Sequence, residues 1–133
     1  MLTLELPFPP SLNHYYRHLG HVTLISRRGR EYRNLVIALL AKQGIRPLVG
    51  ALNLELELYP PDRRRRDADN AMKALLDALA HAGVYQDDSQ IMHLEVWKLP
   101  PVAGGKAVVH LEELTRAAIL RPGRRWPVSG KAP

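Results

Sequence analysis

A chain of 133 residues has the length of one domain and can bury about two thirds of its unfolded surface in a single core. Hydrophobic residues make up 46% of it and charged residues 24%, as in soluble globular proteins, and no apolar run is long enough to cross a membrane. The absence of cysteine excludes disulfides and thiolate metal sites, so a bound metal would need Asp, Glu or His ligands and would be a hard cation such as magnesium. The formal net charge of +6 favours a polyanionic partner, of which nucleic acid is the leading candidate.

The first third of the chain predicts a strand, a loop and a helix. Leucines at every second position of residues 2–6 are typical of a strand with one buried face, and the prolines that follow end it. We expect a rigid, proline-set loop next and then a short extended piece over residues 22–25. Ser26 can cap a helix whose apolar residues recur at helical spacing up to Leu40, with Gly44 as its end.

Two groups of polar residues in this part have no obvious role in folding. The loop after the first strand carries hydrogen-bonding side chains, among them Asn13, Tyr15, Tyr16 and Arg17. Basic residues crowd the start of the predicted helix, namely Arg27, Arg28, Arg30 and Arg33. Cations at this end oppose the helix dipole, which suggests a use beyond folding. We interpret the loop group and the first three of these arginines as candidate nucleic-acid contacts.

The middle of the chain predicts three more strands and a second helix. Residues 52–59 alternate apolar and polar without a break, and a helix follows from about Asn70 to Ala82, with Gly83 as its stop. Further strands are expected around residues 92–96, where Met92, Leu94 and Val96 share an apolar face, and 107–111. One apolar face per strand predicts an α+β fold, a single domain in which helices pack on one face of a mixed sheet. We interpret the opposite face as solvated and not as a metal site; it carries Glu5, Glu55, Glu57, Glu95 and Glu112.

From Thr115 onward the strand and helix patterns stop, and basic residues occur among prolines and glycines. We therefore expect a folded domain over residues 1–114 and a basic, flexible tail over residues 115–133. The tail could add nonspecific phosphate contacts, or it could be an unstructured solvated end.

The stretch from Pro61 to Asp88 is the most charged part of the chain. Its charged residues include Arg63, Arg64, Arg65, Arg66, Asp67, Asp69, Lys73, Asp87 and Asp88. Arginines attract phosphates, and clustered carboxylates hold divalent cations. A metal-dependent nuclease needs both, because carboxylates alone would repel the DNA backbone, whereas bound magnesium can activate a water molecule and stabilise the leaving oxygen. Lys73 would neutralise charge that develops in the transition state.

Each of these residues also has a structural interpretation. One aspartate can cap the helix, and Lys73 can form an ordinary surface ion pair with Asp69, worth only tenths of a kcal/mol. The arginines can be a solvated loop, and Asp87 with Asp88 a turn. A helix cap needs only one aspartate, so it does not explain why two stand beside four arginines. Residue spacing alone nevertheless favours neither the structural interpretation nor a phosphate or metal site.

Asp69 and Asp88 would lie about 20 Å apart along one straight helix, which rises about 1.5 Å per residue. One metal ion cannot bridge that distance. Either the chain folds back after Gly83, or a twofold homodimer brings Asp88 of the partner subunit beside Asp69. We take the homodimer as the working hypothesis.

Three segments together resemble the RusA family of Holliday junction resolvases. They are Leu6-Pro7-Phe8-Pro9-Pro10-Ser11-x-Asn13-x-Tyr15-Tyr16-Arg17-His18, then Pro61-Asp62-Arg63-Arg64-Arg65-Arg66-Asp67-x-Asp69-Asn70 with Lys73, and Gly83-x-x-x-Asp87-Asp88-x-Gln90. The resemblance covers about residues 2–114. It implies a RusA-like fold and a homodimer that binds four-way DNA junctions and makes paired nicks with Mg²⁺ or Mn²⁺. We expect no small-molecule cofactor and no membrane partner, and a cytoplasmic protein that associates with the nucleoid when bound to DNA.

Carried over by position, the resemblance implies that Asp67, Asp69 and Asp88 hold the metal and that they and Lys73 are the catalytic residues. Asp87 is similar to a secondary acidic residue of the family. The function expected is that of a structure-selective endodeoxyribonuclease in DNA recombination and repair. Two alternatives remain open: a metal nuclease that acts on flaps, forks or structured RNA, and a DNA-binding protein on the same fold that has lost catalysis.

Overall fold

The computed structural model describes residues 1–120, except for the side chains of Leu12 and Asn13. In chain order its elements are β1 (Leu2–Leu6), α1 (Leu12–Tyr15), β2 (Tyr16–Leu19), β3 (Val22–Ile25), α2 (Arg27–Lys42), β4 (Leu52–Tyr59), α3 (Ala68–His81), the short 3-10 helix η1 (Asp88–Gln90), β5 (Ile91–Lys98), β6 (Lys106–Glu113) and α4 (Arg116–Ile119). No helix of this part of the chain is long and apolar enough to span a membrane.

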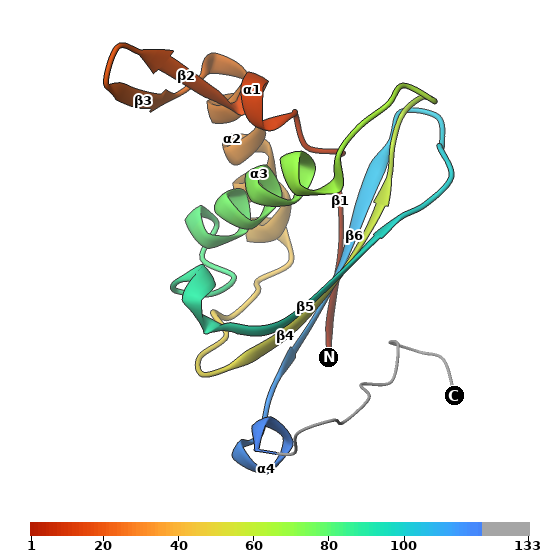
Figure 1. Ribbon diagram of the computed structural model, residues 1–133. Coiled ribbons are helices and arrows are strands. Elements are labelled where there is room, and N and C mark those ends of the chain that lie inside the picture. Colours follow the sequence, from red (N-terminus) through yellow and green to blue (C-terminus); the bar gives the residue numbers. More distant parts are fainter. Residues whose placement is uncertain (121–133) are drawn as a thin grey trace.

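Four strands form a mixed sheet in the order β1-β6-β4-β5, with α2 and α3 on one side of it (Figure 1). Strands β1 and β4 run antiparallel to β6, whereas β4 and β5 are parallel. Parallel neighbours need a crossover connection, and α3 lies within the connection between β4 and β5. The predicted α+β fold with helices on one face of a mixed sheet is thereby confirmed.

The core lies between the central strand β4 and helix α3. Leu52, Leu54 and Leu56 of β4 have no exposed surface, because every second residue of the strand points toward the helices. The buried face of helix α3 contains small residues: Ala71, Ala74 and Ala78 are buried along with its leucines. Short side chains allow the helix to lie close to the sheet, so that the start of α3 is held on a rigid base.

The segment predicted as a rigid loop, residues 11–18, instead consists of a short helix and a strand, which corrects the sequence interpretation. The one-turn helix α1 leads into β2, which pairs antiparallel with β3 in a hairpin that projects beyond the sheet (Figure 1). Gly20, at a φ of 60°, makes the turn. The hairpin lacks the usual apolar alternation because almost all of its residues are exposed, so β2 was not predicted, whereas the short extended piece predicted over residues 22–25 is β3.

Strand β5 also departs from its prediction. A register shift opposite Leu52 and Asn53 sets Ile91 beside Leu52 and leaves Met92 58% exposed. Leu94 lies beside Leu54, yet it is 37% exposed because β5 is an edge strand that the helices cover only in part.

The opposite face of the sheet is less solvated than predicted. Glu55 is 8% exposed, because it lies on the central strand between Glu95 and His110 of the neighbouring strands. Glu57 accepts a hydrogen bond from the Tyr59 hydroxyl, and its carboxylate contacts the His110 imidazole. The sequence prediction of a solvated face is wrong for these two residues, whereas Glu5 and Glu112 are exposed as expected.

The last part of the described chain holds one short helix. Thr115 caps α4, since its side chain accepts a hydrogen bond from the Ala118 amide at 3.2 Å. The predicted loss of regular structure after Leu114 is therefore wrong for residues 116–119, and residues 121–133 lie outside the described part. The division into a domain of residues 1–114 and a tail stays a prediction.

Candidate active site

Helix α3 begins at Ala68, two residues earlier than predicted, and carries the candidate catalytic residues at its start. Asp67 is its N-cap residue in extended conformation, but its side chain makes no capping hydrogen bond. Asp69, in the first turn, lies at the positive end of the helix dipole. Lys73 follows four residues later on the same face, and all three side chains are exposed.

The structural interpretations of these three residues are not supported. Asp67 does not cap the helix with its carboxylate, and no ion pair within residues 1–120 engages Asp69 or Lys73. The two carboxylates and the ammonium group are thus available to a ligand. Exposed carboxylates in this state are the donors that hard divalent cations prefer, so their chemistry fits magnesium.

Asp87 and Asp88 lie in the connection between α3 and β5, close to the start of β5. Asp87 caps η1 and shares a capping box with Gln90, and its hydroxyl partner Ser89 holds the pKa of its carboxyl below the usual range. The Gln90 amide donates to the carbonyls of Leu48 and Gly50 at 3.1 and 3.0 Å. Asp87 therefore shapes a fixed turn, from which the exposed Asp88 follows as the first residue of η1.

Within residues 1–120, no group of three or more His, Asp or Glu side chains lies close enough together to hold a metal ion. The three candidate ligands Asp67, Asp69 and Asp88 therefore do not gather around one point in a single chain. Of the two arrangements that the sequence left open, a fold-back after Gly83 does not complete a three-carboxylate site.

The loop before α3 is held by Asp62. Its carboxylate accepts hydrogen bonds from the Arg66 guanidinium at 2.7 Å and from the Arg64 amide at 2.9 Å, which lowers the pKa of Asp62 to about 2. Lys98 donates to the Arg66 carbonyl at 2.9 Å. Arg66 is thus committed to the loop. Arg63, Arg64 and Arg65 are exposed and enter no ion pair with any described residue, so they remain available to phosphates.

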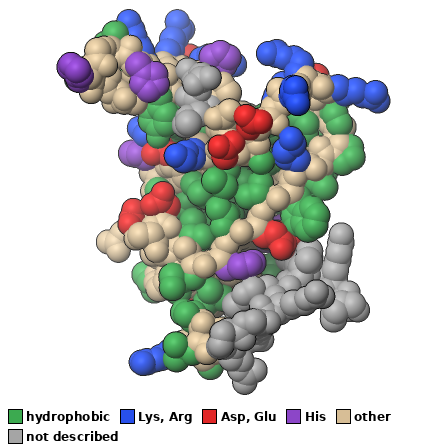
Figure 2. Space-filling model, viewed as in Figure 1, with side chains coloured by type: hydrophobic (Ala, Val, Ile, Leu, Met, Phe, Trp, Pro, Cys, Tyr) green, Lys and Arg blue, Asp and Glu red, His purple; other side chains and the backbone are tan. Residues whose placement is uncertain are grey.

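Basic and acidic side chains share one face of the molecule. Figure 2 shows acidic side chains in the upper half of this face with basic side chains on both sides of them. Of the arginines at the start of α2, Arg27 forms an exposed ion pair with Glu31 at 3.1 Å, and Arg30 donates to the Ile25 carbonyl at 3.1 Å. Arg28 is exposed and lines a groove together with Arg64 and Arg65.

Four residues near α1 were predicted to contact DNA, and those whose side chains are described differ in exposure. Tyr15 has no exposed surface, so it cannot touch DNA in this conformation, and its predicted role is corrected to a structural one. Tyr16 is half-buried with its ring edge-to-face against Tyr15 at 4.8 Å. Arg17 is exposed on β2. The side chain of Asn13 lies outside the described residues.

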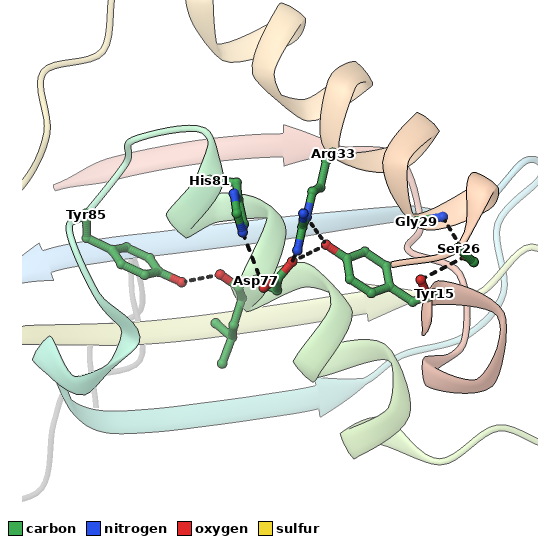
Figure 3. A network of polar contacts seen from close by, with 8 residues as sticks. Tyr15, Ser26, Gly29, Arg33, Asp77, His81 and Tyr85 are labelled. Atoms are coloured by element: carbon green, nitrogen blue, oxygen red, sulfur yellow. Dashed lines mark hydrogen bonds and ion pairs between the residues drawn. The ribbon is translucent and has the colours of Figure 1, made fainter. Parts of the chain in front are cut away.

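Tyr15 belongs to a polar network that sequence reasoning missed (Figure 3). Its hydroxyl donates to Asp77, and Arg33 donates to Tyr15 and to Asp77, both at 2.9 Å, with a further Arg33–Asp77 ion pair at 2.7 Å. Burial and the Asp77 carboxylate raise the pKa of Tyr15, so it stays a neutral donor. Burial opposes the charge of Arg33, yet its bonds to Asp77 and Tyr15 leave its pKa raised.

The network fixes the catalytic helix to its neighbours. Tyr15 ends α1, Arg33 lies on α2, and Asp77 lies one turn beyond Lys73 on α3. Ser26 adds a second clamp, because its hydroxyl and its amide both donate to the Tyr15 carbonyl at 2.8 Å. The excess of arginine at the start of α2 was the signal present in the sequence, but a pairing across 44 residues left no local pattern.

Comparison with known proteins identifies the family to which the chain belongs. The family model described as endodeoxyribonuclease RusA matches residues 7–112. The chain belongs to the endodeoxyribonuclease RusA family. Among its RusA relatives, the crossover junction endodeoxyribonuclease RusA of Shigella sonnei (strain Ss046) is 39% identical over 113 residues, which cover 84% of this chain and 94% of the relative. The protein of that name from Escherichia coli (strain K12) is 38% identical over the same shares, and that of Enterobacteria phage 82 is 39% identical over 112 residues, 84% of this chain and 93% of the relative.

Proposed function

We propose that this protein is a structure-selective endodeoxyribonuclease that resolves Holliday junctions by paired, metal-dependent nicks in DNA recombination and repair. The observation that carries the proposal is its membership of the RusA family across nearly the whole folded part, with relatives named crossover junction endodeoxyribonucleases. The exposed and uncommitted carboxylates beside three uncommitted arginines support a catalytic protein over a purely DNA-binding one.

Asp67, Asp69 and Asp88 are the residues that would hold Mg²⁺, for which Mn²⁺ can substitute. When bound, the metal supplies Lewis-acid chemistry and lowers the pKa of a water molecule. Lys73 lies one helical turn from Asp69 and neutralises the charge that develops on the phosphate oxygens. Arg63, Arg64 and Arg65 draw the DNA backbone to the site and hold it there. We expect no small-molecule cofactor, and a cytoplasmic protein that associates with the nucleoid when it is bound to DNA.

The active unit is a homodimer with a shared site. The absence of any three-carboxylate group among residues 1–120 supports this, because Asp67 and Asp69 then need Asp88 of the partner subunit. A twofold axis makes the contact reciprocal, so that one dimer has two equivalent sites for two paired nicks.

Heterodimers made by co-expressing two differently tagged chains test the shared site. A dimer of an Asp69→Asn chain with an Asp88→Asn chain keeps one intact shared site and nicks one strand of a junction. The reciprocal control joins an Asp69→Asn/Asp88→Asn double variant to an unchanged chain. It has no intact shared site and is inactive, whereas a site built from one chain predicts the reverse in both dimers.

A substrate panel tests the function itself. Labelled four-way junction, linear duplex, flap, replication fork and structured RNA are each incubated with the protein, with magnesium or with chelator. We expect symmetric nicks in the junction that require the metal. Preferential cutting of flaps, forks or RNA would indicate a nuclease of different substrate, and binding without cutting would indicate a protein that has lost catalysis.

A further inference from the structure

A groove of about 920 Å³ opens beside Asp67. Three segments form it: residues 7–11 after β1, the first half of α2, and the loop that leads into α3. Its volume falls within the range of about 300–1,000 Å³ that is usual for small-ligand sites. The site described above uses only its edge, where Asp67 and the arginines of the loop lie.

One wall of the groove is apolar and rigid. Phe8 and the prolines around it form this wall, and the Arg66 guanidinium lies over the Phe8 ring, 5.7 Å from its centre, where its planar group adds to the surface. The buried Tyr32 donates to the Pro7 carbonyl at 2.8 Å. Gly105 packs so tightly that a Cβ there would lie 3.0 Å from the Phe8 Cβ. The wall is therefore fixed before any ligand arrives, which limits the entropy that binding would cost.

The charges around the groove are mainly positive. Arg28 lines it from α2, and Arg64 and Arg65 line it from the loop; none of the three enters an ion pair with a described residue. Of the acidic residues in the lining, Glu31 is already paired with Arg27, and Asp67, the N-cap residue of α3, is a proposed metal ligand whose charge the cation would neutralise. An apolar wall that includes an aromatic ring, with cations on two sides, matches a ligand that joins a planar ring to a phosphate.

We propose that this groove binds one unstacked nucleotide of the DNA strand that is cut, with its base against the Phe8 wall and its phosphate toward Arg28 and Arg64. The inference rests on the proposed function, because a branch point is where a strand offers bases that are not fully stacked. In a duplex the base faces are covered by their neighbours, and the wall could not reach them. Because Asp67 borders the groove, the bound nucleotide lies next to the phosphate that is hydrolysed.

The proposal is tested with DNA junctions that lack one base and with a protein variant in which a larger side chain fills the groove. Leu35 lines the groove and is 46% exposed, so that Leu35→Trp fills the groove without disturbing the core. Val49→Trp is the matched control, since Val49 is 68% exposed and lies outside the groove. Junctions that carry a single abasic site at each position near the branch point are titrated with each protein in chelator, and cleavage rates are measured with magnesium.

We expect one abasic position to weaken binding by the unchanged protein and by Val49→Trp about 5- to 150-fold, the contribution of stacking one base on protein. Leu35→Trp should bind the intact junction about 5- to 150-fold more weakly than the unchanged protein does. An abasic site at that position should then weaken its binding less than a further twofold. Equal losses for all three proteins, or no loss at any position, would overturn the inference. So would a change of oligomeric mass in Leu35→Trp, because the groove would then be a contact between subunits.

The two proposals fail in different ways. A protein that binds junctions in chelator with the expected dependence on one base, but never cuts them, refutes the proposed function and retains the nucleotide groove. A protein that cuts junctions at the same rate with and without each base refutes the groove and retains the function. Failure to bind branched DNA at all overturns both.

Discussion

Loss of the Asp77 carboxylate should destabilise the protein far more than loss of an exposed partner of the same kind. In Asp77→Ala, the Arg33 guanidinium and the Tyr15 hydroxyl lose their shared acceptor, and Tyr15 has no contact with solvent. A hydrogen bond to a charged group contributes about 1.5–3 kcal/mol, and a buried donor left unsatisfied costs about 1–3 kcal/mol. Because the side chains of Arg33 and Asp77 are 20% and 25% exposed, water recovers part of this, and we expect a loss of about 3 kcal/mol.

Urea unfolding at neutral pH measures this loss. With an m-value of ~2 kcal/mol/M, a loss of ~3 kcal/mol lowers the midpoint by about 1.5 M. Glu31→Ala is the control, since it also removes a carboxylate from an arginine on a helix, but that pair is 86% and 63% exposed and should contribute less than about 0.5 kcal/mol. A double-mutant cycle with Arg33→Ala should give a coupling of about 1–3 kcal/mol. If Asp77→Ala and Glu31→Ala shift the midpoint equally, the network does not stabilise the fold as argued.

Further predictions concern the packing of α2, the loop before α3 and the DNA contacts. Gly29→Ala should lower the free energy of unfolding by about 1–3 kcal/mol in the same urea assay, because its Cβ would meet the Tyr15 carbonyl oxygen; an unchanged midpoint would contradict the packing. The pKa of Asp62 is lowered, so its contribution to stability is present above about pH 4 and is lost as the pH falls to about 2; in Arg66→Ala, carbon-13 NMR should find this pKa raised but still below its usual range, because the Arg64 amide bond remains, and no rise would exclude the ion pair. Replacing Arg63–Arg65 with glutamine should reduce the slope of log K against log salt for junction binding by about 2.7, or 0.9 for each phosphate contact, whereas an unchanged slope would place the DNA elsewhere.

The sequence predicted the sheet and the two long helices because each of them buries one face. The leucines of β4 repeat every second residue and those of α3 recur at helical spacing, so local pattern and final burial agree. Where an element is exposed on both sides, as in β2, no such pattern exists, and the strand was not recognised. The register shift in β5 is set by pairing with β4, which the β5 sequence does not record.

Sequence reasoning likewise recognised some residues of the candidate site and misassigned others. The aspartates and arginines around α3 could be recognised because their charges are adjacent in sequence. Tyr15 was misassigned because its hydroxyl was counted as a surface group, although it closes a partly buried network with Arg33 and Asp77. Those partners lie 18 and 62 residues away, so only the packed fold brings the three groups together.

A single comparison tests the central claim that carboxylates at the start of α3 serve catalysis and not folding or DNA attraction. Asp69→Asn removes one proposed metal ligand and leaves every arginine of the loop in place. The account predicts that this variant binds a four-way junction with at least the affinity of the unchanged protein in chelator, and that it makes no nicks when magnesium is added. Nicking by Asp69→Asn at the unchanged rate would contradict the assignment of the site.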